Sequence, residues 1–331
     1  MAAIPASLPP TWRKTLAGDA WRANPPLAAL VLGMLAFLVI SLIGLAADPR
    51  IITGAPAWMK PLKFAVSIAI YGATLLWLLT FIPDRPRLVK ALSWGLLLGF
   101  ALEMVLIAMQ AARGTTSHFN RETPFDSAVW NAMGATIVGM WLLNAIVAFL
   151  LARRRFAAAP IVWGVRLGLT VALIGMALAF LMPPPTPEQM ALIEATGSSP
   201  VIGAHAVGVA DGGPGLPVVG WSTTGGDLRV GHFVGLHALQ GVPLFALALL
   251  RFGPDWLSMR ERSRFVAIAA AAWFGLVALV TWQALRGQPL VAPDELTLAA
   301  LGGWVALTVV AAFAVIAWAR TRPERAETLR R

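Results

Sequence analysis

The sequence contains no cysteine, a single tyrosine and few charged residues, and these shortages exclude several classes of protein. Without cysteine, the chain has no disulfide framework, no thiolate metal site and no catalytic thiol. Charged residues make up only 13% of the 331 residues, about half the share of a typical globular chain. A soluble domain could not cover its apolar surface with so few charges, so the sequence predicts a protein whose solvent is lipid.

Long apolar runs take the place of the missing charges. Hydrophobic residues make up 58% of the chain, and its mean hydropathy is +0.73. Eight runs are long enough to cross a bilayer core of about 30 Å, which takes about 20 helical residues. They lie near residues 26–47, 64–83, 91–112, 126–151, 160–182, 228–250, 265–285 and 296–319. Because backbone groups in lipid need internal hydrogen-bond partners, the sequence predicts an all-α, polytopic transmembrane helical bundle of about eight spanning helices.

Basic residues indicate how these spans are oriented. Nineteen of the 26 Lys and Arg residues fall on the side of the two termini, and seven fall on the other side. Because basic residues are enriched in cytoplasmic loops, we predict that both termini face the cytoplasm. The net charge of +10 then reports topology rather than nucleic-acid binding. An Arg- and Ala-rich chain without cysteine further suggests a bacterial inner (cytoplasmic) membrane.

The spans divide the chain into five predicted segments. These are an interfacial cytoplasmic segment (1–25), helices one to five (26–182), an extracytoplasmic lid loop (183–227), helices six to eight (228–319) and a basic cytoplasmic tail (320–331). Within the first segment, Trp12, Leu16 and Trp21 lie beside basic residues, so we expect residues 11–22 to lie on the membrane surface.

The lid loop carries signals of local order. Thr186 precedes Pro187 and Gln189, which predicts a capped, short amphipathic helix that ends near Thr196 and is stopped by Gly197. The rest of the loop is rich in turn residues but also contains aliphatic and aromatic side chains. A long loop of this kind is usually functional or disordered, and we expect an ordered lid.

All four histidines fall on the predicted outer side. His118 and His205 lie in outer loops, and His232 and His237 lie in the outer half of helix six, with Gln240 between them around the helix. Imidazoles at this depth could ligate a transition metal or haem iron, or carry protons. Haem is the weaker alternative because it needs facing axial ligands, and no recognised zinc spacing is present. We assign no role to His205, and purely structural histidines are a further alternative.

Three carboxylates are candidate catalytic groups. Glu103 is the only carboxylate deep in a span, roughly 15 Å from the outer end of helix three. Such a residue is a functional candidate by default, and we expect it to face the bundle interior. The alternative is a protonated Glu103 that is hydrogen-bonded between helices. Asp126 and Asp227 are the other two candidates, although Asp126 also fits a capping box with Thr123, and Asp227 fits the N-cap of helix six.

Basic and polar residues near the same side suggest a site for an anion or a lipid headgroup. Lys60, Lys63 and Tyr71 lie on one face of helix two, with ammonium groups above hydroxyls. Lysines that simply extend to the interface would give the same pattern. The other candidate ligand-binding residues are Gln110, Arg113, Asn120, Arg229 and Gln240.

Two stretches of the chain resemble an uncharacterised group of bacterial polytopic membrane proteins. They are residues 110–126 (QAARGTTSHFNRETPFD) and residues 220–240 (GWSTTGGDLRVGHFVGLHALQ). The resemblance extends from the second helix to the sixth. It supports the membrane class and implies no particular activity, cofactor or site.

Three functions agree with these features. The first is a membrane protein with an outward-facing polar pocket that binds a metal or small ligand and is redox-active or hydrolytic, with His118, His232 and His237 as metal ligands. The second is a proton-coupled transporter or receptor for a small anionic or lipidic ligand. The third is a non-catalytic scaffold. The absence of a P-loop and of a Rossmann fingerprint argues against nucleotides. We expect helices two, three and six to enclose one pocket, and we leave open whether the protein is an enzyme.

Overall fold

The computed structural model describes residues 16–321. The predicted surface segment 11–22 is therefore covered only from Leu16 onward, and the basic tail 320–331 lies outside the described residues beyond Thr321. Within the covered part, helix α1 (Leu16–Ala23) carries the exposed Trp21 and an ion pair between Arg22 and Asp19.

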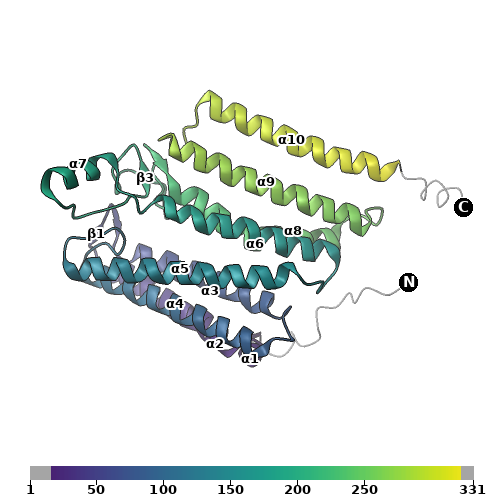
Figure 1. Ribbon diagram of the computed structural model, residues 1–331, viewed down its shortest axis with the longest axis horizontal. Helices are drawn as coiled ribbons and strands as arrows, with labels where there is room; N and C mark the ends of the chain where they lie inside the picture. Colours follow the sequence, from purple (N-terminus) through teal and green to yellow (C-terminus); the bar gives the residue numbers. More distant parts are fainter. Residues whose placement is uncertain (1–15, 322–331) are drawn as a thin grey trace, which may run out of the picture. The chain divides into compact units, whose positions relative to one another are not determined.

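Eight helices are long and apolar enough to cross a membrane, which confirms the predicted all-α transmembrane bundle (Figure 1). They are α2 (Pro25–Ala47), α3 (Met59–Leu79), α4 (Pro86–Arg113), α5 (Pro124–Ala152), α6 (Ala159–Ala177), α8 (Leu228–Phe252), α9 (Met259–Leu285) and α10 (Glu295–Arg320). A short 3-10 helix, Leu178–Leu181, continues α6. Two antiparallel strand pairs complete the described elements: β1 (Ile51–Ile52) with β2 (Ala55–Pro56), and β3 (Ala206–Val207) with β4 (Gly226–Asp227).

Three helices begin about five residues earlier than their apolar runs. The first turns of α3, α4 and α9 contain Lys60, Arg87 and Arg260, which carry charge but are still helical. Hydropathy detects the part of a helix that lies in hydrocarbon, whereas a polar first turn extends the same helix into the headgroup layer. The first residue of each predicted run therefore marks where the helix enters the hydrocarbon, and the helix itself begins earlier.

The chain forms two compact units. Unit 1 contains the described residues up to His118 together with Pro124–Leu143, and unit 2 contains Phe119–Thr123 and the residues from Asn144 onward. Helix α5 contributes its first part to unit 1 and its last part to unit 2.

In unit 1, helices α2, α3, α4 and the first part of α5 surround the interior. Asn24 caps the start of α2 and donates a hydrogen bond to the buried Ser93 of α4. Close packing of α4 on α5 depends on two glycines: a Cβ at Gly95 would meet the Leu143 side chain, and one at Gly99 would meet Met140. The absence of a side chain at these two positions leaves room for Leu143 and Met140 of α5.

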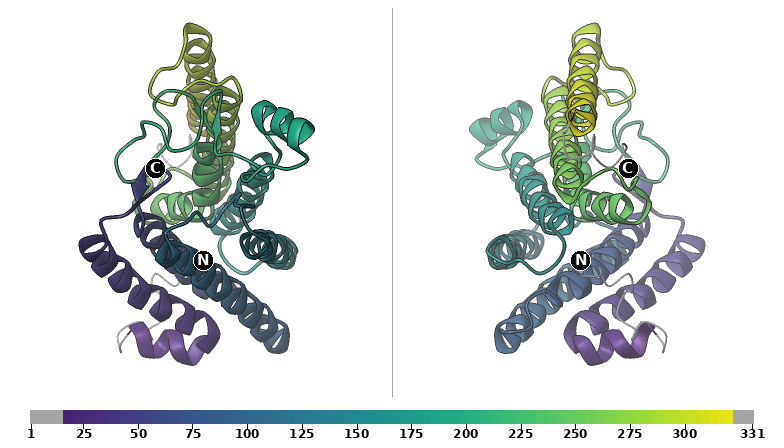
Figure 2. Two further views of the ribbon diagram at one scale, coloured as in Figure 1. Left: turned by 90° about the vertical axis from the view of Figure 1, so that its left-hand side faces the viewer. Right: turned by 90° about the vertical axis from the view of Figure 1, so that its right-hand side faces the viewer.

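In unit 2, helices α6, α8 and α9 pack against one another, and α10 packs on α9 (Figure 2). The closest approach brings backbone against backbone, because a Cβ at Gly175 would lie 2.6 Å from the Cα atom of Gly235. Tryptophan rings cover other glycines: Trp273 lies on Gly241, and its indole donates a hydrogen bond to a carbonyl of α8. Small residues thus allow helices to approach closely in lipid.

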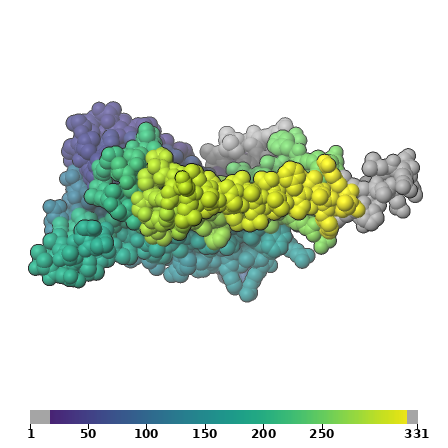
Figure 3. All heavy atoms as spheres, turned by 90° about the horizontal axis from the view of Figure 1, so that it is seen from above, coloured from purple at the N-terminus to yellow at the C-terminus, as the bar shows by residue number. Residues whose placement is uncertain are grey.

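Helix α10 is the most exposed spanning helix of unit 2. No residue of its most apolar stretch is buried, and Figure 3 shows it uncovered along its length on the visible face. It is held to α9 through Trp304, which lies on Gly275 and donates a hydrogen bond to the Ala272 carbonyl.

The lid loop, residues 183–227, is folded, as predicted. Helix α7 (Pro187–Thr196) has the predicted capping box at Thr186 and ends at Gly197 in the left-handed conformation, although none of its residues is buried. The loop also pairs with the segment before α5 in unit 2: the Arg121 amide donates to the Pro200 carbonyl, and Ile202 donates to Phe119.

Candidate functional site

The predicted site residues are divided between the two units. Unit 1 holds Lys60, Lys63, Tyr71, Glu103, Gln110, Arg113, His118 and Asp126, and unit 2 holds Asn120, His205, Asp227, Arg229, His232, His237 and Gln240. A single pocket that contains all of them stays a prediction. Within each unit, the predicted site residues differ in their hydrogen bonds, ion pairs and ring contacts.

Glu103 is buried inside unit 1. Its residue is only 2% exposed, which confirms the expectation that it faces the interior. Among the described residues, neither carboxylate oxygen of Glu103 has a hydrogen-bond partner. The alternative in which a protonated Glu103 bonds to a neighbouring helix is therefore not what the structure contains. A buried polar group without a partner is costly, and this one is the strongest functional candidate in unit 1.

An apolar layer separates Glu103 from the end of α4. Ile107, one turn beyond Glu103, clusters with Val129 and Met133 of α5, and Phe64 of α3 packs against them. All three core members of this layer are at most 5% exposed. Hydrocarbon side chains therefore lie along this helix face between Glu103 and Gln110, which are about 10 Å apart at 1.5 Å per residue.

A polar triad lies beyond the apolar layer. The Oδ1 atom of Asp126 accepts hydrogen bonds from Gln110 at 2.8 Å and from Arg113 at 2.6 Å. Arg113 also donates to the side chain of Gln110, so the three groups form a closed set. The Arg113 guanidinium lies over the Phe125 ring and is partly exposed, whereas Asp126 and Gln110 are buried. The triad thus places a positive, solvent-facing group above the apolar layer.

Two helix α3 residues bring further charge and aromatic surface to this end of unit 1. The positive charge of Lys60 interacts electrostatically with the carboxyl group of Glu103. Phe64 lies edge-on to the His118 ring, and the Trp130 ring lies 5.3 Å from the His118 ring between centroids. His118 is therefore half-buried between aromatic rings of unit 1 rather than free in a loop.

In unit 2, the two histidines of α8 have different surroundings. The Nδ1 atom of His232 donates a hydrogen bond to the Gly175 carbonyl of α6, at 2.8 Å, which ties the two helices together. His237 packs edge-on against Phe233 at 4.4 Å between ring centroids. Gln240, one turn further along, is half-buried. The hydrogen bond to Gly175 therefore gives His232 a structural role in the packing of α8 on α6.

Asp227 and Arg229 are engaged at the start of α8. The Asp227 side chain accepts from the Arg229 amide and caps the helix, which confirms the capping alternative. It also accepts from the Ser222 amide and from the Arg229 guanidinium, which in turn donates to the Gly220 carbonyl. This network joins the lid loop to α8.

A His–Asp pair in the lid loop was not predicted. His205 Nδ1 lies 2.7 Å from Asp211 Oδ2, and the carboxylate also accepts from the His205 and Ala206 amides. Burial alone would raise the pKa of Asp211, but these hydrogen bonds and the His205 charge lower it to about 2. The turn-rich sequence after Asp211 is a general signal, and only the fold shows that His205 is its partner.

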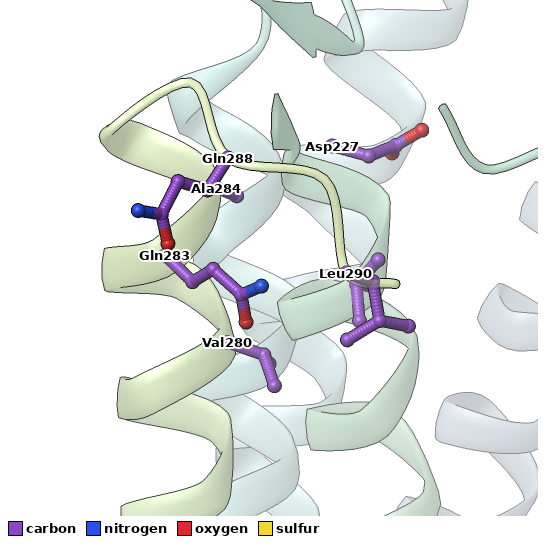
Figure 4. A pocket seen from close by; sticks show the side chains of 7 residues that line it. Asp227, Val280, Gln283, Ala284, Gln288 and Leu290 are labelled. Carbon is purple, nitrogen blue, oxygen red and sulfur yellow. The ribbon is translucent and has the colours of Figure 1, made fainter. Parts of the chain in front are cut away.

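A small pocket lies beside the start of α8 (Figure 4). It is partly open and is lined by Asp227, Val230, Val280, Gln283, Ala284, Gln288 and Leu290. Figure 4 shows the Asp227 carboxylate turned away from the two glutamines. Gln283 donates to the Pro289 carbonyl and Gln288 accepts from Thr297, so the polar lining is already used in loop contacts.

No metal centre forms within residues 16–321: the structure brings no three His, Asp or Glu side chains close enough to hold an ion. All four histidines belong to this part of the chain, so a metal ion has no prepared ligand set in it. Comparisons with protein-family models, with curated proteins and with solved structures found no match to this chain. The functional assignment therefore depends on the side-chain geometry alone.

Proposed function

We propose that the protein is a proton-coupled membrane transporter for a small anionic ligand, with Glu103 as the proton-binding group. The observation that carries this proposal is the buried carboxyl of Glu103, whose two oxygens have no hydrogen-bond partner among the described residues. Eight apolar spans with no nucleotide-binding motif agree with a transporter that uses an ion gradient.

The physical argument concerns the charge of Glu103. An ionised carboxylate in a span is expensive unless a counter-ion or hydrogen-bond donors compensate it. Lys60, at the start of α3, interacts with the Glu103 carboxyl group electrostatically but donates no hydrogen bond to its oxygens. A carboxyl group in this position holds a proton in the resting arrangement and releases it when an arriving group or water changes its surroundings. That behaviour is what a proton carrier requires.

The basic side chains near the end of α4 supply the anion-binding part of the proposal. Lys60 and Lys63 occupy the first turn of α3, and Arg113 presents a partly exposed guanidinium from the polar triad. An anion bound here would compete with Asp126 for Arg113 and loosen the triad above the apolar layer. Coupling then follows, since an opened layer gives Glu103 access to the proton supply.

Proton flux in proteoliposomes tests the proposal. Purified protein is reconstituted with an internal pH dye, and succinate, citrate or inorganic phosphate is added outside. We expect at least one of these anions to change the internal pH, and Glu103→Gln to abolish the change. Glu194→Gln is the matched control, because Glu194 lies exposed on α7 and should leave the flux intact. Absence of flux with all three anions, or full flux in Glu103→Gln, would contradict the proposal.

The direction of transport depends on the orientation of the chain. We propose a bacterial inner-membrane protein with both termini inside, on the basis of the basic-residue asymmetry. The cysteine-free chain allows His118→Cys, His205→Cys and Ala157→Cys to be labelled singly in intact cells. An impermeant thiol reagent should modify positions 118 and 205 and leave 157 unmodified. The opposite pattern would reverse the orientation.

A further inference from the structure

We propose that unit 2 carries a binding site for the phosphate headgroup of an anionic phospholipid. It lies where α9 begins and α10 ends, and its residues are Arg260, Arg264, Arg320, Trp256 and Trp318, here called the arginine site. This site is independent of Glu103 and of the proposed transport.

Three guanidinium groups from two helices converge on two indole rings. Arg264 lies 3.8 Å above the Trp318 ring centroid, and Arg260 lies 5.9 Å from the same ring. Arg320 lies 5.7 Å from the ring of Trp256, which belongs to the loop before α9. Stacking on an indole fixes the guanidinium plane and leaves its N–H edge available, as phosphate binding requires.

The positive charge of the arginine site is not neutralised within the described part of the chain. None of Arg260, Arg264 and Arg320 forms an ion pair with a carboxylate of residues 16–321. Glu261, the adjacent acid, is 2% exposed and belongs to the capping box of Ser258. Asp255 in the same loop makes no ion pair with them. The site therefore has an excess of positive charge.

The opposite end of the same helix pair provides the contrast. There Arg286 pairs with Asp294, and the Asp294 carboxylate also caps α10. Arg262, which lies between Arg260 and Arg264 in sequence, is likewise engaged, because it is buried and donates to carbonyls of the loop between α8 and α9. Uncompensated arginines are thus a property of one end of the α9–α10 pair.

A lipid headgroup fits this position better than a soluble anion. The arginine site lies at the ends of two apolar spans, where hydrocarbon gives way to headgroups, and Trp318 is 40% exposed, as is typical of that boundary. The apolar stretch of α10 has no buried residue, so acyl chains can run along it from a headgroup held at its end. Basic pockets between spanning helices are known to bind anionic lipid headgroups, and guanidinium forks match phosphate oxygens.

Thermal unfolding in nanodiscs tests the site. Wild-type protein is placed in phosphatidylcholine alone and in phosphatidylcholine with phosphatidylglycerol, and its Tm is compared. We expect phosphatidylglycerol to raise the Tm of wild type, and the triple variant Arg260→Gln, Arg264→Gln, Arg320→Gln to lose most of this rise. Native mass spectrometry should show phosphatidylglycerol retained by wild type and lost from the variant.

A charge-matched variant distinguishes a specific site from general electrostatic attraction. The triple variant Arg85→Gln, Arg87→Gln, Lys90→Gln removes three positive charges at the start of α4 in unit 1 and should keep the rise in Tm. The proposal is overturned if both triple variants lose it equally, or if the arginine-site variant keeps it. It is also overturned if inorganic phosphate in phosphatidylcholine nanodiscs reproduces the whole shift.

A single variant keeps the test meaningful if the triple variant is poorly folded. Arg264→Gln removes the guanidinium nearest to an indole ring and leaves the other two in place. It should lower the retention of phosphatidylglycerol while leaving the Tm in phosphatidylcholine unchanged. Retention equal to that of wild type in this variant would count against the proposal.

Discussion

Glu103 in unit 1 has surroundings opposite to those of Asp227 and His232 in unit 2. In unit 2, Asp227 caps α8, and His232 donates to the carbonyl of Gly175. Unit 1 keeps the carboxyl of Glu103 buried with no hydrogen-bond partner, although the polar triad nearby is fully connected. Unit 1 therefore retains an energetically unfavourable group, whereas Asp227 and His232 in unit 2 stabilise α8 and its contact with α6.

This difference bears on where the proposed proton chemistry lies. In unit 2, the close contact of Gly175 with Gly235 brings the backbones of α6 and α8 together. An uncompensated carboxyl group persists only where the rest of the fold tolerates its cost, and such groups concentrate at functional sites. The contrast supports the assignment of the proposed proton chemistry to unit 1.

The largest expected effect tests the rigidity of unit 2. In Gly175→Val, the added side chain meets the backbone of Gly235, so we expect a loss of about 3 kcal/mol of unfolding free energy. Gly302→Val is the control, because nothing lies within 4 Å of its Cβ position. Denaturant titration in mixed micelles measures both variants. Equal stability of the two would show that the α6–α8 contact is not tight.

The second prediction tests the cost of Glu103. Replacement of this unpartnered carboxyl by an apolar side chain of similar length, in Glu103→Met, should raise stability by about 1–3 kcal/mol and abolish proton flux. Asp126→Leu should instead lower the stability, because it leaves Gln110 and Arg113 without their acceptor. Thermal unfolding compares the two variants. A destabilised Glu103→Met would break the comparison by showing that Glu103 is compensated.

The third prediction concerns pH and the lid loop of unit 2. The pKa of Asp211 falls from its ordinary value of 3.8 to about 2 in the folded loop. A lowered carboxyl pKa contributes stability that is present above the ordinary value and is lost as pH falls through the folded value. We therefore expect residues 183–227 to become sensitive to pepsin between these two pH values. In Asp211→Asn, the loop should be cleaved by pepsin at both of these pH values. If cleavage of this variant depends on pH as it does in wild type, the His205–Asp211 pair is excluded as the cause.

The smallest predicted effect is at α10. Trp304→Phe removes the hydrogen bond to the Ala272 carbonyl while keeping most of the ring on Gly275, so we expect a loss of about 1 kcal/mol. Trp94→Phe is the control, because Trp94 is 45% exposed on α4. The Tm in detergent measures both, and an equal effect would mean that the α9–α10 bond adds nothing specific.

The fold follows from the sequence because lipid imposes one simple requirement, a run of apolar residues long enough to span. The run near 228–250 matches α8 (Leu228–Phe252), and the one near 126–151 matches α5 (Pro124–Ala152). The early start of α3 could not be found in this way, since Lys60 and Lys63 in its first turn lower the hydropathy there without breaking the helix.

The candidate site was only partly predictable. Glu103 is evident from the sequence because a carboxylate in a span is rare, and its burial follows from helix geometry. The closed triad of Asp126 was missed, since Thr123 and Asp126 also have the spacing of a capping box. The partnership of His205 and Asp211 depends on a turn in the lid loop, and short-range patterns do not specify which loop groups meet.

The attachment of α10 to α9 has a consequence for the order of assembly. Helices α6, α8 and α9 pack against one another, whereas α10 packs on α9 and buries none of its most apolar stretch. During synthesis, those three helices can close together before α10 has left the translocon, and α10 then docks as a finished helix with its own cap at Asp294. A released chain that ends before residue 295 would therefore form a membrane intermediate in which α6, α8 and α9 already pack together.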